Sequence, residues 1–256
     1  MRMAEITPKQ FEILLLLYRF RFLDRKHIQK FLKHKDPRRI NAWLKDLTEK
    51  NIIGRKYSTS LKENTLPAVY YLITGSRKYL LEKDGINSQV LNRVYREKLR
   101  SERLIDHCLL LTDIYFILEN KSRKEKFKIT FVTKTELANY SNAPSECPDA
   151  YILVKTKGDM TRIFFEIIDQ DTPRFALRKK MTDYVEYIIE GTWKKTYKKP
   201  YPSLFILCPN EKTKKYLSRY IPDVLSENDL EKFQVLLCTR SVVLETEWKK
   251  GIWDCV

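Results

Sequence analysis

The sequence predicts a protein of the α/β class (α+β overall) made of two parts with different patterns. Residues 7–73 show three helical apolar patterns and then two short strands. From residue 104 onward, the elements follow the order αβββαβ, with a further helix and strand after them. The apolar run at residues 203–208 is typical of a strand covered on both faces, so a mixed sheet is expected in the second part.

The first part begins with a helix, because Thr7-Pro8 supplies an N-cap and a proline at the first helical position. A second helix is expected over residues 24–33 and a third from Asp36-Pro37 onward. The apolar stripe of the third helix consists of Ile40, Trp43, Leu44 and Leu47. Strands at 52–57 and 68–73 follow, and three short helices with a β-hairpin form a winged helix-turn-helix, which we assign to residues 1–86.

In that fold the third helix enters the major groove of DNA, and the hairpin, or wing, contacts phosphates. We therefore predict DNA contacts from polar side chains on the third helix and on the wing. These are Arg38, Arg39, Asn41 and Lys45 on the helix, and Arg55, Lys56 and Lys62 on the wing. The alternative is a winged helix that contacts proteins and presents these charges to solvent.

A polar, basic stretch at residues 87–103 separates the two parts, and we expect it to form a linker helix. The second part, residues 104–256, then continues with a helix from about 104 and strands at 128–133, 150–154 and 163–168. A helix at 174–190 is predicted to bury Phe175 among other apolar residues. A strand at 203–208, a helix at 211–220 and a strand at 233–239 complete the order.

The composition favours a polyanionic partner. There are 49 Lys and Arg against 33 Asp and Glu, which gives a formal net charge of +16. Because neutralising phosphates releases condensed counterions, such a balance predicts binding to double-stranded DNA. The five cysteines form no CxxC pair, so a zinc site is not expected. No apolar stretch approaches the roughly 20 residues needed to span a bilayer, and without a signal-peptide pattern a cytoplasmic protein with reduced thiols is predicted.

Two acids occupy unusual places in the apolar strands of the second part. Pro148-Asp149 opens the strand at 150–154, and Glu166 lies inside the strand at 163–168. A buried charge is costly unless it is paired, so a metal ion, a lysine or a water-filled cleft is expected beside Glu166. Carboxylate oxygens suit Mg²⁺ or Mn²⁺, which could activate water and neutralise charge at a phosphate. The structural alternatives are a turn-forming Asp149 and an ordinary ion pair at Glu166.

This order of elements, with Pro-Asp and then Glu, resembles the PD-(D/E)xK nuclease superfamily. That superfamily has Lys two residues after the strand acid, and here the position is Ile168. Some of its nucleases supply the lysine from the following helix, which implies Lys180 as the candidate here. The resemblance implies a catalytic group of Asp149, Glu166 and Lys180 with Mg²⁺ or Mn²⁺, or an inactive nuclease fold.

Several short segments follow the winged helix in a fixed order. They are residues 105–109 around His107, Thr135-Glu136-Leu137, Pro148-Asp149-Ala150, residues 164–169 and a helix with Lys180 and Tyr184. With the winged helix, this arrangement is similar to the replication-relaxation family of plasmids and other mobile elements. It implies a role in replication, mobilisation or their control. It adds Glu136 to Asp149 and Glu166 as a candidate metal ligand.

Three functions remain open from the sequence. The protein is a DNA-binding protein with an inactive nuclease-like domain, an active Mg²⁺-dependent DNA nicking or cleaving endonuclease, or a transcriptional regulator or protein-interaction factor. Replication, transfer or transcription proteins are the expected protein partners. A palindromic DNA site would require a homodimer, although the sequence contains no heptad pattern. No GxxxxGK[ST] loop is present, which disfavours an NTPase.

Overall fold

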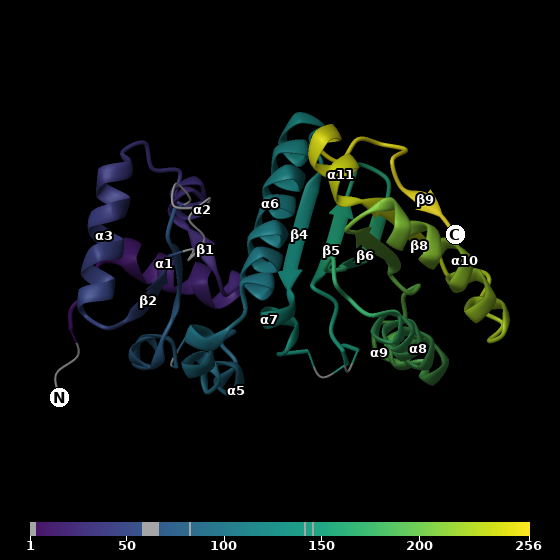
Figure 1. The fold of residues 1–256 in the computed structure, drawn as a ribbon, viewed down its shortest axis with the longest axis horizontal. Helices are drawn as coiled ribbons and strands as arrows, with labels where there is room; N and C mark the ends of the chain where they lie inside the picture. Colours follow the sequence, from purple (N-terminus) through teal and green to yellow (C-terminus); the bar gives the residue numbers. More distant parts are fainter. Residues whose placement is uncertain (1–3, 58–66, 82, 141, 145) are drawn as a thin grey trace. The chain divides into compact units, whose positions relative to one another are not determined.

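The computed structural model describes residues 4–57, 67–81, 83–140, 142–144 and 146–256 (Figure 1). By its internal contacts the chain divides into two compact units, Met1–Thr112 and Asp113–Val256. Each unit has its own sheet. The first sheet has three strands and the second has six, so the two units are described separately.

Unit 1 contains the helices and strands predicted for a winged helix-turn-helix, in the predicted order, with one additional short strand. The helices are α1 (Pro8–Phe20), α2 (Arg25–Phe31) and α3 (Pro37–Glu49), and the strands are β1 (Leu23–Asp24), β2 (Ile53–Lys56) and β3 (Val69–Leu72). The strands form an antiparallel sheet in the order β1-β3-β2. The sequence did not predict β1 because two residues are too few for a period-2 pattern.

Capping residues in the sequence fix where these three helices begin. Thr7 and Gln10 form a reciprocal capping box at the start of α1. The Asp24 carboxylate accepts the His27 N–H at the start of α2, and Asp36 caps α3 ahead of Pro37. Each helix buries side chains, and α3 packs against both α1 and α2. In α3 the buried residues are Ile40, Leu44 and Leu47, and each contributes roughly 1.5–3 kcal/mol as an upper estimate.

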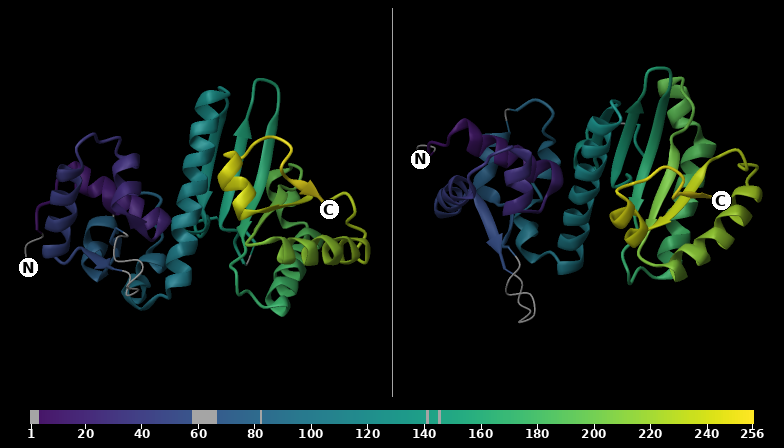
Figure 2. Two further views of the ribbon diagram at one scale, coloured as in Figure 1. Left: turned by 45° about the horizontal axis from the view of Figure 1, so that its top comes forward. Right: turned by 90° about the horizontal axis from the view of Figure 1, so that it is seen from above.

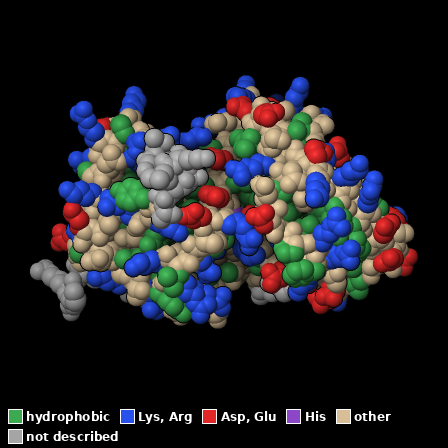
Figure 3. Space-filling model, in the orientation of Figure 1, with side chains coloured by type: hydrophobic (Ala, Val, Ile, Leu, Met, Phe, Trp, Pro, Cys, Tyr) green, Lys and Arg blue, Asp and Glu red, His purple; other side chains and the backbone are tan. Residues whose placement is uncertain are grey.

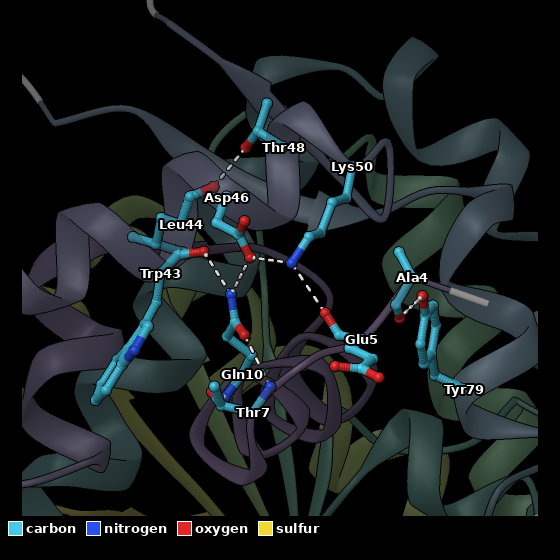
Figure 4. A network of polar contacts seen from close by, with 10 residues as sticks. All are labelled: Ala4, Glu5, Thr7, Gln10, Trp43, Leu44, Asp46, Thr48, Lys50 and Tyr79. Carbon is cyan, nitrogen blue, oxygen red and sulfur yellow. Dashed lines mark hydrogen bonds and ion pairs between the residues drawn. The ribbon is translucent and has the colours of Figure 1, made fainter. Parts of the chain in front are cut away.

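A polar network attaches the end of α3 to α1 (Figure 4). The Gln10 side chain, which is 2% exposed, donates to the Asp46 carboxylate at 2.6 Å. Lys50 Nζ donates to the same carboxylate oxygen at 2.7 Å and to the Glu5 carbonyl oxygen at 2.9 Å. The network and the buried stripe together fix the rotation of α3, so its opposite face points to solvent.

The basic stretch at 87–103 differs from the single helix that we predicted. It contains the short helix α5 (Ser88–Leu91), the 3-10 helix η3 (Val94–Leu99) and then the first residues of α6. Two buried side chains, Leu91 and Val94, attach it to unit 1, where η2 (Thr74–Ser76) and α4 (Arg77–Leu80) precede it. The stretch lacks a long apolar stripe, so no extended helical face is available to bury, and it folds in short turns instead.

Unit 2 has a mixed six-stranded sheet in the order β4-β5-β6-β7-β8-β9. The strands are β4 (Lys128–Thr133), β5 (Ala150–Lys155), β6 (Met160–Ile167), β7 (Ser203–Cys208), β8 (Val235–Thr239) and β9 (Asp254–Cys255). The pairs β6–β7 and β7–β8 are parallel and the other pairs are antiparallel. Together with α6 and α8 this is the αβββαβ order expected, so the predicted α/β class with a mixed sheet is confirmed.

Helices cover both faces of this sheet (Figure 2). On one face lie α6 (Glu102–Lys124) and α11 (Arg240–Thr246), and on the other lie α8 (Arg174–Glu190) and α10 (Glu211–Ser226). Tyr115 of α6 packs against Phe131, and Trp248 packs against Phe165. The opposite face holds a core of sheet and helix residues that includes Phe164, Ile168 and Leu177. Two smaller helices, α7 (Lys134–Leu137) and α9 (Thr192–Tyr197), complete the unit.

Two predicted details of unit 2 are wrong. The helix at 211–220 was expected to end before Pro222, but α10 continues through this proline to Ser226. Burial of Ile221 and Leu225 offsets the proline penalty, which is about 3 kcal/mol in a helix interior. Phe175 was expected in the core but is 75% exposed, because it lies on the outer side of the first turn of α8. None of the helices in the described part of the chain is long and apolar enough to cross a membrane.

Candidate functional site

The register of β5 and β6 brings the two predicted acids together. Ala150 pairs with Phe165, so Asp149, the residue just before β5, lies opposite Glu166 on β6. Residues opposite each other in an antiparallel pair share one face of the sheet. For Glu166 this is the face of Phe164 and Ile168, which is covered by α8.

Glu166 is fully buried, and both of its carboxylate oxygens accept hydrogen bonds from α8. Lys180 Nζ donates to Oε2 at 2.5 Å, and the Tyr184 hydroxyl donates to Oε1 at 2.6 Å. The two donors lie four residues apart, so they project from one face of the helix. The Lys180 side chain is 31% exposed and forms the solvent side of the pair. We call these three residues with Asp149 the acid–lysine site.

The charges in this site shift one another's proton affinities. Burial raises the pKa of the Glu166 carboxyl, and Lys180 only partly opposes this effect. Burial alone would lower the pKa of the Lys180 ammonium, but the Glu166 and Asp149 carboxylates outweigh it and raise that pKa. Burial and the nearby Glu166 charge raise the pKa of Tyr184 well above its usual value. Tyr184 therefore stays a neutral hydrogen-bond donor.

Asp149 is also held in place by the backbone around it. Its Oδ2 accepts the N–H of Ile167 at 2.8 Å, and its own carbonyl oxygen accepts the N–H of Lys134 at 2.9 Å. Asp149 is 7% exposed. The carboxylate therefore serves as an acceptor at the end of β6, and the carbonyl oxygen ties Asp149 to the start of α7.

The structure does not bring Glu136 to this pair. The Glu136 carboxylate accepts the Thr133 N–H at 2.8 Å and the Thr133 hydroxyl at 3.1 Å, which forms the capping box of α7. Among the described residues, no three His, Cys, Asp or Glu side chains form a group that could hold a metal ion. Both Glu166 oxygens are already occupied by Lys180 and Tyr184. This arrangement does not fit a Mg²⁺ or Mn²⁺ ion, so the metal and catalytic roles remain predictions.

The sequence predicted Lys180 as a partner for the site but assigned no contact to Tyr184. The signal for Tyr184 was its spacing of four residues from Lys180. That spacing could be interpreted only once the rotation of α8 was known. A separate hollow of about 1050 Å³ lies at the other end of β6, where Met160 and Arg162 line it, and is not part of the acid–lysine site.

The four predicted residues of α3 all lie on its exposed side. Arg38, Arg39, Asn41 and Lys45 are exposed, while the opposite side of the helix is buried. The Arg39 guanidinium lies 5.6 Å from the centre of the Trp43 ring. Lys45 Nζ lies 3.7 Å from the Glu49 carboxylate in a long ion pair, and both side chains are mostly exposed. Basic side chains also cover much of the surface in view in Figure 3, with acidic ones between them.

The predicted wing residues differ from one another. Arg55 is exposed, with its guanidinium 5.0 Å from the centre of the Tyr57 ring. Lys56 is half-buried and donates to the Arg100 carbonyl oxygen at 3.3 Å, so it is partly engaged within unit 1. Lys62 lies outside the described residues.

These features define an α/β protein with a helical, basic first unit and a mixed-sheet second unit that holds a buried acid–lysine site. The replication-relaxation family profile matches residues 14–200. The match covers most of the chain, and the protein therefore belongs to the replication-relaxation family. The similarity proposed from the sequence is thus confirmed.

Other comparisons are weaker. Among curated proteins, none matches this sequence. Two solved structures, the restriction endonuclease FokI and the same enzyme bound to DNA, match with 11% and 13% identity and TM-scores of 0.32 and 0.33. In both matches 95% of this chain covers 45% of the other, so the chain spans less than half the length of FokI. TM-scores at this level do not establish a common fold.

Proposed function

We propose that this protein binds double-stranded DNA through α3 and acts in the replication or mobilisation of a plasmid or other mobile element, or in the control of these processes. The observation that carries the proposal is the amphipathic character of α3. Its apolar side is buried in unit 1, and its solvent side presents Arg38, Arg39, Asn41 and Lys45.

Membership of the replication-relaxation family supports the biological setting. The arrangement of α2, α3 and the β2–β3 hairpin supports a winged helix, in which a helix such as α3 reads the major groove. Asn and Arg are suited to base edges in that groove, whereas Lys provides a point charge for phosphates. In this proposal unit 2 serves as a scaffold without catalytic activity, because the Glu166 carboxylate is already paired with Lys180 and Tyr184.

The test is equilibrium binding to duplex DNA from the protein's own genetic locus, in competition with unrelated duplex. We expect the substitution pair Arg38→Ala and Arg39→Ala to weaken locus binding by at least tenfold, since a bidentate arginine contact with a base contributes roughly 1–3 kcal/mol. Asn41→Ala should reduce the preference for the locus over unrelated DNA.

A matched control removes two cations far along the chain, Lys249→Ala and Lys250→Ala, which are both exposed. This control should leave the preference for the locus unchanged. Equal binding of locus DNA by wild type and by the Arg38 and Arg39 variant would contradict the proposal.

A second candidate function is a metal-dependent endonuclease, and one observation favours it. Asp149 and Glu166 lie opposite each other on β5 and β6, and Lys180 donates a hydrogen bond to Glu166. These three residues are the catalytic group implied by the nuclease resemblance. This function requires Lys180 or Tyr184 to leave Glu166 when a cation binds. It would therefore need a different arrangement of the site from the one described above.

The endonuclease is tested with a supercoiled plasmid that carries the locus, with and without Mg²⁺ or Mn²⁺. The variant Asp149→Asn keeps an acceptor for the Ile167 N–H and removes the charge. Metal-dependent nicking by wild type that is lost in this variant would establish the enzyme. Tight locus binding without nicking, and no shift of the melting temperature by either metal, would leave unit 2 as a scaffold.

A further inference from the structure

We propose that a basic face on α8 and α10 binds the phosphate backbone of nucleic acid independently of its sequence. This surface is separate from the contact proposed for α3. The proposal rests on the proposed function only in taking nucleic acid as the partner. We call this surface the Arg–Tyr face. Its members are Arg174, Arg178, Lys212, Lys215, Tyr216, Arg219 and Tyr220, and with Asp223 most of them line an open hollow of about 460 Å³.

Two arginines of α8 are held by two tyrosines of α10. The guanidinium carbon of Arg174 lies 4.8 Å from the centre of the Tyr216 ring, and that of Arg178 lies 5.5 Å from the Tyr220 ring. Arg178 Nε also donates to the Tyr216 hydroxyl at 2.8 Å. The two rings are parallel within 5°, with centres 6.0 Å apart. The tyrosines therefore position both guanidinium groups without neutralising them.

An arginine that lies against a ring keeps most of its N–H donors for another partner. The planar guanidinium can bind two oxygens of one phosphate at once, which suits the backbone of a nucleic acid. A carboxylate partner would have cancelled the charge and occupied the same donors. The choice of tyrosine as the partner of Arg174 and Arg178 therefore leaves a site that is ordered and still cationic.

The cations of α10 divide into two sets. Lys214 donates to the Asp254 carboxylate at 2.6 Å and is neutralised by it. In the described part of the chain, Lys212, Lys215 and Arg219 have no carboxylate within ion-pair distance, although Asp223 lines the same hollow. Like charges three and four residues apart destabilise a helix. A bound polyanion would remove this repulsion.

The fold fixes which way this face points. The buried side of α10 consists of Leu217, Ile221 and Leu225. These side chains pack in the same core as Leu177 and Met181 of α8. Neither helix can rotate without exposing that core, so the five cations stay directed to solvent. A flexible surface would lack this preorganisation.

The experiment uses the full chain and a short labelled duplex of arbitrary sequence, in an Arg38→Ala and Arg39→Ala background. In this background binding through α3 is reduced, so the contribution of the Arg–Tyr face dominates. Affinity is measured over a range of salt concentrations for the triple variant Lys212→Ala, Lys215→Ala and Arg219→Ala. Loss of three phosphate contacts should weaken binding by about tenfold or more and lower the slope of log affinity against log salt by roughly 2–3.

Two further variants distinguish a specific phosphate-binding site from a nonspecific effect of net charge. A control with the same charge change, Lys157→Ala, Lys249→Ala and Lys250→Ala, removes exposed lysines elsewhere on unit 2 and should leave the slope nearly unchanged. The substitutions Tyr216→Leu and Tyr220→Leu keep the net charge and should still weaken binding severalfold, because Arg174 and Arg178 lose their positions. Equal losses in the triple variant and its control would overturn the proposal, as would full binding by the tyrosine variant.

Phe175 is 75% exposed beside Arg174, so vesicles of anionic lipid serve as a second probe. Vesicle binding that depends on the face, together with unchanged DNA binding, would overturn the proposal in favour of a membrane partner. Failure of this proposal and failure of the α3 proposal give different results. If the α3 proposal is wrong, the Arg38→Ala and Arg39→Ala protein will still prefer the locus. The salt slope of the triple variant would still report on the Arg–Tyr face.

Discussion

Basic side chains have opposite environments in the acid–lysine site and on the exposed surfaces of α3 and α10. Lys180 approaches a carboxylate that is fully buried, and the pair is completed by a tyrosine hydroxyl. Arg38 on α3 and Arg219 on α10 belong to groups of exposed cations that have few carboxylate partners among the described residues. A cation that is paired inside the protein cannot be removed without leaving its partner unpaired, whereas an unpaired cation remains available to an external polyanion.

The contrast is sharpest on α8, where neighbouring residues have different roles. Arg178 lies against the tyrosines of α10, and Lys180 reaches Glu166 in the core. Two positions along a helix correspond to a rotation of about 200°, so the two side chains point to nearly opposite sides. One helix thus supplies both the internal ion pair and part of the proposed nucleic-acid surface.

The largest expected effect comes from breaking the internal pair. Lys180→Met leaves the buried Glu166 carboxylate with Tyr184 as its remaining donor of the two on α8 and should lower the free energy of unfolding by about 3 kcal/mol. Urea denaturation measures this change. The double variant Lys180→Met and Glu166→Leu should recover most of the loss, because it removes both charges. A Lys180→Met protein as stable as wild type would show that the pair does not support the fold.

A smaller effect should appear in the pH dependence of stability. The pKa of Glu166 is raised above its usual value of 4.5, so the folded state binds this proton more tightly than the unfolded state. The resulting contribution is fully present below pH 4.5 and is lost as the pH rises through the folded pKa. Each unit by which the pKa is raised corresponds to about 1.4 kcal/mol.

The measurement compares wild type with Glu166→Gln by urea denaturation at several pH values from 4 to 8, a range chosen to bracket the usual pKa. We expect the stability of wild type relative to the variant to fall as the pH rises, because only wild type contains this titrating group. In wild type, Lys180 stays charged throughout that range because the nearby carboxylates raise its pKa. A relative stability that rises with pH would mean that Lys180 outweighs burial and depresses the Glu166 pKa.

The smallest effect is expected one residue away. Lys179 pairs with Asp183 at 2.8 Å, and its side chain is 70% exposed. Solvent screens such a pair, so Lys179→Met should leave the urea midpoint unchanged within error. Because Lys179→Met and Lys180→Met make the same chemical change, the two variants isolate the effect of burial. A loss of stability in Lys179→Met comparable with that in Lys180→Met would contradict this comparison.

Local patterns in the sequence were sufficient to predict most elements of the fold. Thr7-Pro8 and Asp36-Pro37 predicted where α1 and α3 begin, and the structure adds Asp24 as the cap of α2. The continuous apolar run at 203–208 predicted β7, and the patterns at 128–133 and 174–190 predicted β4 and α8, all with their observed bounds. The shortest elements, such as β1 and β9, were not predicted because two residues pair only when a neighbouring strand is already in place.

The class of the fold, the family and the two acids could be predicted from the sequence, since these depend on residue type and on spacing along the chain. Which side chains meet depends instead on three-dimensional packing. It placed Asp149 opposite Glu166 through the β5–β6 register and brought Tyr184 to Glu166. It also gave Glu136 a capping role and exposed Phe175. These outcomes depend on strand register and on the rotation of each helix, which the packing of the whole core fixes and no local pattern encodes.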